Sequence, residues 1–208
     1  WSVAIPAVCL RLKIFLTHIQ GRVHTVSEEL IVEQCSPTLA GIKTGSLFTV
    51  PSKNGGELKE SIKRLNSVMV PRGIRVIPVK KLKSRVLIYL YRPERLKEDL
   101  KDSVAENILS EKNYPIKNAD LCVAELIKRL KSDGDFPHEV GLFLGYPSED
   151  VNGFIKYGAD KAKLVGTWRV YGDMEAAKKK FALYNKCTGL YKKAYRKHNS
   201  FDRLIVSC

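Results

Sequence analysis

The chain has 208 residues, of which 44% are hydrophobic, and it carries a formal net charge of +14. This length and apolar content are typical of a folded globular protein and exclude a disordered chain. Apolar runs such as Val86-Leu-Ile-Tyr-Leu-Tyr91 are far shorter than the roughly 20 residues of a membrane-spanning helix, so we expect no membrane partner.

The number and spacing of the cysteine and histidine residues indicate which cellular compartment and which cofactors to expect. Five cysteines are scattered along the chain without a C-x-x-C pair, and four histidines show no metal-ligand spacing. The chain also lacks the glycine-rich motifs that bind nucleotide phosphates. We therefore expect a cytoplasmic protein with reduced thiols, no metal and no cofactor.

The first 25 residues differ in composition from the rest. They contain no Asp or Glu, and Arg11 and Lys13 interrupt their apolar run, unlike the uninterrupted core of a signal peptide. We interpret 1–25 as a non-native or disordered upstream segment and 26–208 as a single globular domain. A genuine N-terminal helix or strand is the alternative for 1–25.

Helical patterns dominate the next part of the chain. Residues 27–34 are typical of a short helix, and Ser36-Pro37 suits the start of another, which we expect to reach almost to Pro51. A further helix is predicted over 57–70, because its leucine and isoleucine residues recur on one face.

Two β-rich segments follow, at 74–79 and 85–91, and their spacing predicts an antiparallel hairpin. Pro78 cannot donate a ladder hydrogen bond, so its strand is expected at a sheet edge. The predicted fold class is α+β: a small, mainly antiparallel sheet, made of the hairpin plus a third strand, covered by several helices. The remaining predicted elements are helices at 93–109 and 119–131, a strand at 164–171 and a helix from 173 to about 197.

A helix-turn-helix-like pair is predicted in the segment 136–155. Gly141 would allow two helices to cross closely, Gly145 would make the turn, and Val151 and Phe154 would complete the core. A structural helical corner without DNA-binding function is the alternative.

The second helix of this pair would face nucleic acid with Ser148, Asn152 and Lys156. Asn152 could bind an adenine edge and Lys156 a phosphate. Glu149 and Asp150 suit a helix N-terminus, but they would face a polyanion unfavourably.

A thiol-based site is the second hypothesis. Cys35 precedes a predicted helix start, which favours a thiolate, and His138 with Glu139 could supply the base. Lys43 or Arg92 would then bind an anionic substrate. A buried structural cysteine and a surface histidine form the alternative reading.

The aromatic residues near the C-terminus allow two readings. Trp168, Tyr171 and the tyrosines of the final helix lie among lysines, an arrangement that can stack bases and neutralise phosphates. The same aromatic residues recur at helical spacing, which favours a core stripe with the lysines in water.

Three segments resemble a known family: Cys35-Ser-Pro-Thr-Leu-Ala-Gly41, the run from Phe136 to Ile155, and Gly166-Thr-Trp-Arg-Val-Tyr-Gly-Asp173. They are similar, in order and spacing, to a bacterial family catalogued only as domain of unknown function number 3793. The resemblance covers roughly 27–195, and it implies no activity, because none is established for the family.

The basic charge and the helical pair together favour a non-enzymatic binding or regulatory role, with nucleic acid or an anionic small molecule as the partner. The alternative is a thiol-dependent enzyme with Cys35 as nucleophile and His138 as base. A plain interaction module remains a third reading.

Overall fold

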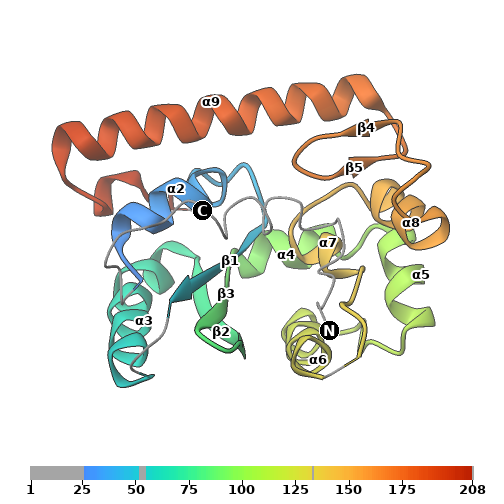
Figure 1. Ribbon diagram of the computed structural model, residues 1–208, viewed down its shortest axis with the longest axis horizontal. Helices are drawn as coiled ribbons and strands as arrows, with labels where there is room; N and C mark the ends of the chain where they lie inside the picture. The colour runs from blue at the N-terminus through green and yellow to red at the C-terminus, as the bar shows by residue number, and fades with distance from the viewer. Residues whose placement is uncertain (1–25, 52–54, 133, 208) are drawn as a thin grey trace. The chain divides into compact units, whose positions relative to one another are not determined.

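Helices and a small antiparallel sheet make up the residues that the computed structural model describes, 26–51, 55–132 and 134–207 (Figure 1). The α+β fold class is thereby confirmed. Residue contacts group the described chain into two compact units: unit 1 comprises 98–181, and unit 2 comprises 26–97 and 182–207. The predicted upstream segment 1–25 lies outside the described residues, and the single-domain assignment of 26–208 stays a prediction.

Unit 2 contains a three-stranded antiparallel sheet in the order β1-β3-β2. Its strands are β1 (Gly45–Pro51), β2 (Arg75–Lys81) and β3 (Arg85–Tyr91). Helix α2 (Glu28–Leu39) packs on β1 and β3, and α3 (Gly55–Met69) packs on β2 (Figure 1). Buried residues of all these elements form one core, which also takes in the 3-10 helix η3 (Asp202–Leu204) near the C-terminus.

The predicted hairpin is the β2–β3 pair, and Pro78 lies on an edge strand as expected. The pairing register shifts between Pro78 and Lys80. A proline and a bulge on an edge strand both discourage further strand addition, so this edge of the sheet is protected.

The predicted helix from Ser36 almost to Pro51 is wrong. Ser36 and Pro37 lie in the last turn of α2, which ends at Leu39, where the backbone N–H groups of Ile42 and Lys43 both bond to the Pro37 carbonyl. The residues after this turn form β1, whose Leu47-Phe-Thr-Val50 run has the aromatic and β-branched character of a strand.

Unit 1 is mainly helical. Its helices are α5 (Ser103–Glu111), α6 (Ala119–Lys131), α7 (Val140–Phe143) and α8 (Ser148–Tyr157). The predicted helix 93–109 is divided into α4 (Pro93–Asp99) and α5, because the Asp102 carboxylate caps a new helix by accepting from the N–H groups of Val104 and Ala105.

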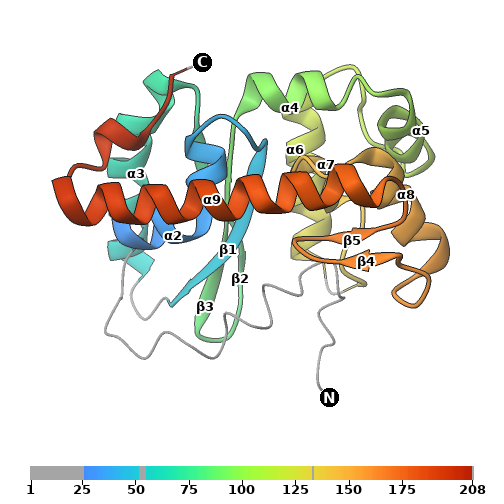
Figure 2. The ribbon, with the colours of Figure 1, turned by 90° about the horizontal axis from the view of Figure 1, so that it is seen from above.

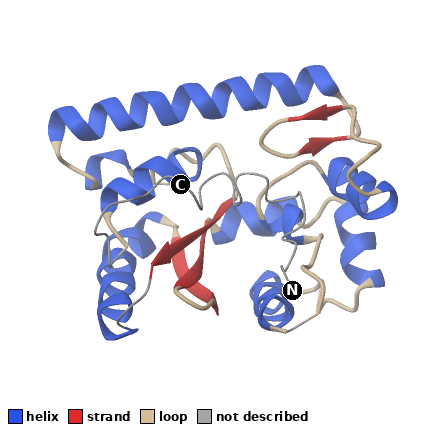
Figure 3. Cartoon of the chain, in the orientation of Figure 1, coloured by secondary structure: helices blue, strands red, loops and turns tan. Residues whose placement is uncertain are grey.

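The predicted strand 164–171 is also divided. It forms a separate hairpin of β4 (Leu164–Val165) and β5 (Arg169–Val170), the short red pair in Figure 3. Gly166 closes the turn, with its N–H bonded to the Trp168 carbonyl at 3.0 Å. The third strand of the main sheet is therefore β1.

The final helix, α9 (Met174–His198), is continuous, as predicted (Figure 2). It begins in unit 1 and continues into unit 2. The expected inner stripe is present, with Ala177 and Tyr184 buried, and the buried Cys187 belongs to the same side.

Candidate ligand-binding site

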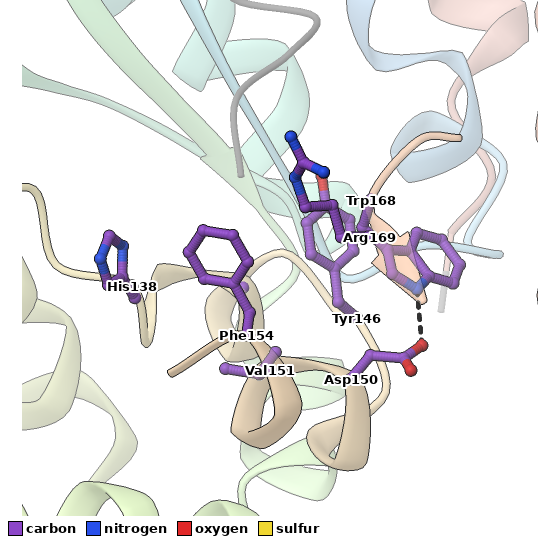
Figure 4. Close-up of a pocket in the computed structure, with 8 residues that line it drawn as sticks. His138, Tyr146, Asp150, Val151, Phe154, Trp168 and Arg169 are labelled. Carbon is purple, nitrogen blue, oxygen red and sulfur yellow. Dashed lines mark hydrogen bonds between the residues drawn. The ribbon is translucent and has the colours of Figure 1, made fainter. Parts of the chain in front are cut away.

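A small pocket in unit 1 is built from the second and third of the segments that carry the family resemblance. Its volume is about 270 Å³, which includes space open to solvent. Figure 4 shows its aromatic side chains, with Phe154 and Tyr146 between His138 and Trp168. The lining residues are His138, Gly141, Tyr146, Asp150, Val151, Phe154, Trp168 and Arg169.

The corner between α7 and α8 shapes one wall, and both glycine predictions hold there. A Cβ atom on Gly141 would lie 2.7 Å from Val151 Cγ2, so only glycine permits this approach of the helices. Gly145 has a φ of 74°, a left-handed conformation that glycine adopts readily. The first helix of the pair is a single turn of four residues.

Asp150 joins α8 to the opposite wall. Its carboxylate accepts hydrogen bonds from Trp168 Nε1 at 2.7 Å, Tyr171 N at 2.7 Å and Gly172 N at 2.8 Å. The residue is only 3% exposed, and these three donors replace the water that burial removes. Asp150 thus positions the indole of Trp168 in the pocket (Figure 4).

Aromatic rings form the apolar part of the site. Tyr146 stacks on Trp168 with ring centroids 5.0 Å apart, and the His138 ring meets Phe154 edge-on at 4.9 Å. Phe181 of α9 packs edge-to-face with Trp168, with ring centroids 4.5 Å apart. These rings give the pocket an apolar lining.

Two buried side-chain nitrogen atoms of the pocket residues have no hydrogen-bond partner in the part of the protein that the structure describes. Among the described residues, the buried side-chain polar atoms without a hydrogen bond are His138 Nδ1 and Arg169 Nε. Both residues line this one pocket. Buried polar groups are nearly always paired in folded proteins, so this coincidence indicates that a ligand or water completes the site.

Arg169 is the cation of the pocket. Its Nη1 donates to the Ala159 carbonyl at 2.9 Å, and no carboxylate of the described residues lies within ion-pair distance of its guanidinium. Trp168 and Arg169 are consecutive residues, which would face opposite sides of a regular strand, but both line the pocket. The reason is that Trp168 lies in the hairpin turn, where strand alternation does not apply.

His138 is held in its neutral form. Burial lowers its pKa below the ordinary value of 6.5, and this effect outweighs the opposing charge of the adjacent Glu139. Glu139 itself is buried and engaged elsewhere, accepting from Tyr114 Oη at 2.9 Å and lying 3.6 Å from Lys112 Nζ. Arg129 Nη1 lies 3.7 Å from the same carboxylate. Glu139 therefore anchors the loop that carries His138.

The predicted nucleic-acid residues lie on α8, which packs against α5, α7 and β5. Ser148 is half-buried and hydrogen-bonds the Asp102 carboxylate, which contributes to lowering the pKa of Asp102. Asn152 is half-buried, and Lys156 is exposed. Their role in nucleic-acid binding stays a prediction.

Cys35 and His138 belong to different units, 2 and 1 respectively. Cys35 lies inside α2, not at a helix start, and it is fully buried. Burial raises the pKa of the Cys35 thiol to about 12, although the Lys43 charge and a hydrogen bond with Ser46 act in the opposite direction. The thiol is thus protonated at neutral pH, which is unfavourable for a nucleophile.

The two predicted anion-binding residues are both buried in unit 2. Arg92 donates through Nε to the Thr38 carbonyl and through Nη2 to the carbonyls of Leu39 and Val206, each at 2.7 Å. The first two carbonyls end α2, so the guanidinium caps this helix. Anion binding by Lys43 and Arg92 stays a prediction.

The sequence reading missed Tyr146, Asp150 and Arg169 as members of one site. The sequence assigns no role to Tyr146, and for Asp150 it indicates a favourable charge at a helix N-terminus and an unfavourable one opposite DNA. The sequence feature that could have indicated this site is that 136–155 and 166–173 are two of the three segments that carry the family resemblance. The two segments are joined by hydrogen bonds between residues about 20 positions apart in sequence. The Asp150 carboxylate accepts from Trp168, Tyr171 and Gly172.

Within the described ranges, no group of three or more His, Cys, Asp or Glu side chains could hold a metal ion. No helix in these ranges is both long enough and apolar enough to cross a membrane.

Comparison with known proteins identifies the family. The family described as "Protein of unknown function (DUF3793)" matches residues 31–205, so the chain belongs to it. Neither the search of curated proteins nor that of solved structures produced a match.

Proposed function

We propose that the protein is a non-enzymatic binding protein for a small, flat, anionic ligand, and that the ligand occupies the pocket of unit 1. One observation carries the proposal: the two unpartnered buried nitrogen atoms, His138 Nδ1 and Arg169 Nε, belong to residues of the same aromatic pocket.

The chemistry of the lining residues defines the ligand class. Arg169 can donate to a carboxylate or another oxyanion, and neutral His138 can donate or accept through Nδ1, depending on its tautomer. The rings of Tyr146, Phe154 and Trp168 bury an apolar, planar body. A small aromatic or conjugated carboxylate satisfies all of these groups.

The same residues argue against catalysis in the pocket. Its lining contains no Ser, Thr, Cys or Lys side chain, which leaves His138, Tyr146 and Asp150 as the groups that could act as a nucleophile or base. The Asp150 carboxylate already accepts three hydrogen bonds, which leaves it poorly placed to act as a base. The alternative thiol enzyme draws no support from the fully buried Cys35.

Trp168 provides a direct reporter of binding. The chain has two tryptophans, so a Trp1→Phe variant leaves Trp168 as the sole indole. We expect benzoate to change the Trp168 fluorescence saturably, with a Kd of roughly 1 mM for so small a probe. Benzamide, which has the same shape without the charge, should bind at least about fivefold more weakly, since a hydrogen bond to a charged group contributes more.

Two variants separate recognition from folding. Arg169→Gln removes the cation and should abolish the preference for benzoate over benzamide, whereas Lys161→Gln removes an exposed cation outside the pocket lining and should preserve it. The proposal fails if neither probe perturbs Trp168 at tens of millimolar. It also fails if a folded Arg169→Gln protein keeps the charge preference.

A further inference from the structure

The final helix carries a concentration of positive charge on its solvent side. Over 25 residues α9 contains eight Lys and Arg residues, and its one acidic residue is Glu175, in the first turn. In the part that belongs to unit 2, Tyr191, Ala194 and Tyr195 pack against the core. The opposite side, here termed the outer α9 face, consists of Leu183, Lys186, Leu190, Lys193, Arg196 and Lys197, all exposed.

The cations of the outer α9 face are not neutralised by the fold. Lys192, at the margin of the buried side, forms an ion pair with Glu33 at 2.6 Å. By contrast, no carboxylate of the described residues lies within 4 Å of Lys186, Lys193, Arg196 or Lys197. Unpaired charges of one sign on one helix face favour association with a polyanion.

The arrangement of the side chains favours nucleic acid over a lipid surface. Leu183 and Leu190 are 49% and 56% exposed, but Lys186 lies between them along the same face. Binding in a bilayer interface needs a continuous apolar stripe, which this interruption prevents. Lys186 and Lys193 lie two turns apart, roughly 10 Å, and Arg196 and Lys197 follow about one turn later. They lie along a rod of a width that fits the major groove of a duplex.

We propose that the outer α9 face binds the phosphate backbone of nucleic acid without reading its sequence. This placement avoids the difficulty of α8, where the exposed Glu149 would face the phosphates. The inference goes beyond the pocket and does not depend on any ligand bound there.

The test is the salt dependence of binding to a labelled duplex of mixed sequence, followed by fluorescence anisotropy with the full chain. Four phosphate contacts predict a slope of log affinity against log salt of about −3.6, so affinity should fall about a hundredfold between roughly 50 and 200 mM salt. The variant Lys186→Gln/Lys193→Gln/Lys197→Gln should retain a slope of about −1 and lose only about fourfold over this range.

A control variant with the same change of net charge shows whether binding depends on the outer α9 face or only on the overall positive charge of the protein. Lys59, Lys63 and Lys83 are exposed and lie outside α9, so their replacement by Gln should leave the slope near −3.6. Glutamine has a helix propensity close to that of lysine, and circular dichroism should show unchanged helicity in both variants. If the α9 triple variant does not fold, Lys193→Gln alone should reduce the slope by about 0.9.

Three results would overturn the proposal. The first is the absence of duplex binding even at low salt. The second is an equal loss of slope in the two triple variants. The third is binding to phosphatidylcholine vesicles that contain about 30% phosphatidylserine but not to the duplex, which would assign the face to an anionic membrane surface.

Discussion

His138 shows how a single side chain responds to its surroundings in the pocket. Its ring packs edge-on against Phe154, and its Nδ1 is buried without a protein partner. Burial lowers its pKa, and the neighbouring charges of Glu139, Lys112 and Asp135 only modify this effect. The folded protein therefore favours the neutral imidazole.

A pH dependence of stability follows from this residue. Because the pKa of His138 is below 6.5 in the folded state, the unfolded chain binds the proton more readily as the pH falls below 6.5. The contribution of His138 to stability is thus present above pH 6.5 and is lost as the pH falls through the lowered pKa. We expect His138→Gln to flatten the decline in the free energy of unfolding as the pH falls below 6.5.

Urea unfolding at a series of pH values measures this decline. The exposed His198, at the end of α9, gives the matched control His198→Gln, which should keep the wild-type profile. A wild-type profile in the His138→Gln protein would show that burial does not disfavour the imidazolium form of His138.

At the scale of elements, Asp150 connects α8 to the hairpin β4–β5 and the segment after it. A helix of ten residues and a two-residue ladder are each too short to be stable alone, so the three hydrogen bonds of this carboxylate fix their relation. The pocket exists because these elements are joined.

Asp150→Ala should therefore be strongly destabilising. It leaves the N–H groups of Trp168, Tyr171 and Gly172 without their acceptor, and we expect a loss of about 2–4 kcal/mol in the free energy of unfolding. The exposed carboxylate of Asp160 provides a control, since Asp160→Ala should change stability by less than about 0.5 kcal/mol. Denaturant titration of both variants would contradict this account if the two losses were similar.

At the scale of the whole molecule, buried cysteines lie in both units. Cys122 belongs to unit 1, and Cys35 and Cys187 belong to unit 2. Burial raises the pKa of each thiol, to about 12 for Cys35. Alkylation of these thiols near pH 8 should therefore require the chain to open.

Alkylation rates can test whether 26–208 unfolds as a single domain. If it does, the free energies of opening derived from Cys35 and Cys122 should agree within about 0.5 kcal/mol and depend equally on urea. Iodoacetamide labelling followed by peptide mass spectrometry measures both sites in one sample, with denatured protein as the control. Unequal values would separate the two units, and rapid native labelling of Cys35 would revive the thiol-enzyme hypothesis.

Local patterns in the sequence determined several features. The apolar face of α3, the β-rich runs of β2 and β3, and the stripe of α9 recur with the period of their own element, so they can be recognised without knowledge of the fold. Pro78 on the sheet edge and the glycines of the α7–α8 corner were also predictable, because each acts through the geometry of its own backbone. The composition further indicated a basic protein.

Only the tertiary structure decided where chemistry can occur. The signal at Ser36-Pro37 was compatible with a helix start, yet packing of β1 beside β3 made these residues a helix end. The depth of Cys35, the capping role of Arg92 and the meeting of Asp150 with Trp168 all depend on partners distant in sequence. Hydrogen bonds and burial of this kind have no local period, and for that reason the pocket of His138 and Arg169 could not be read from the chain alone.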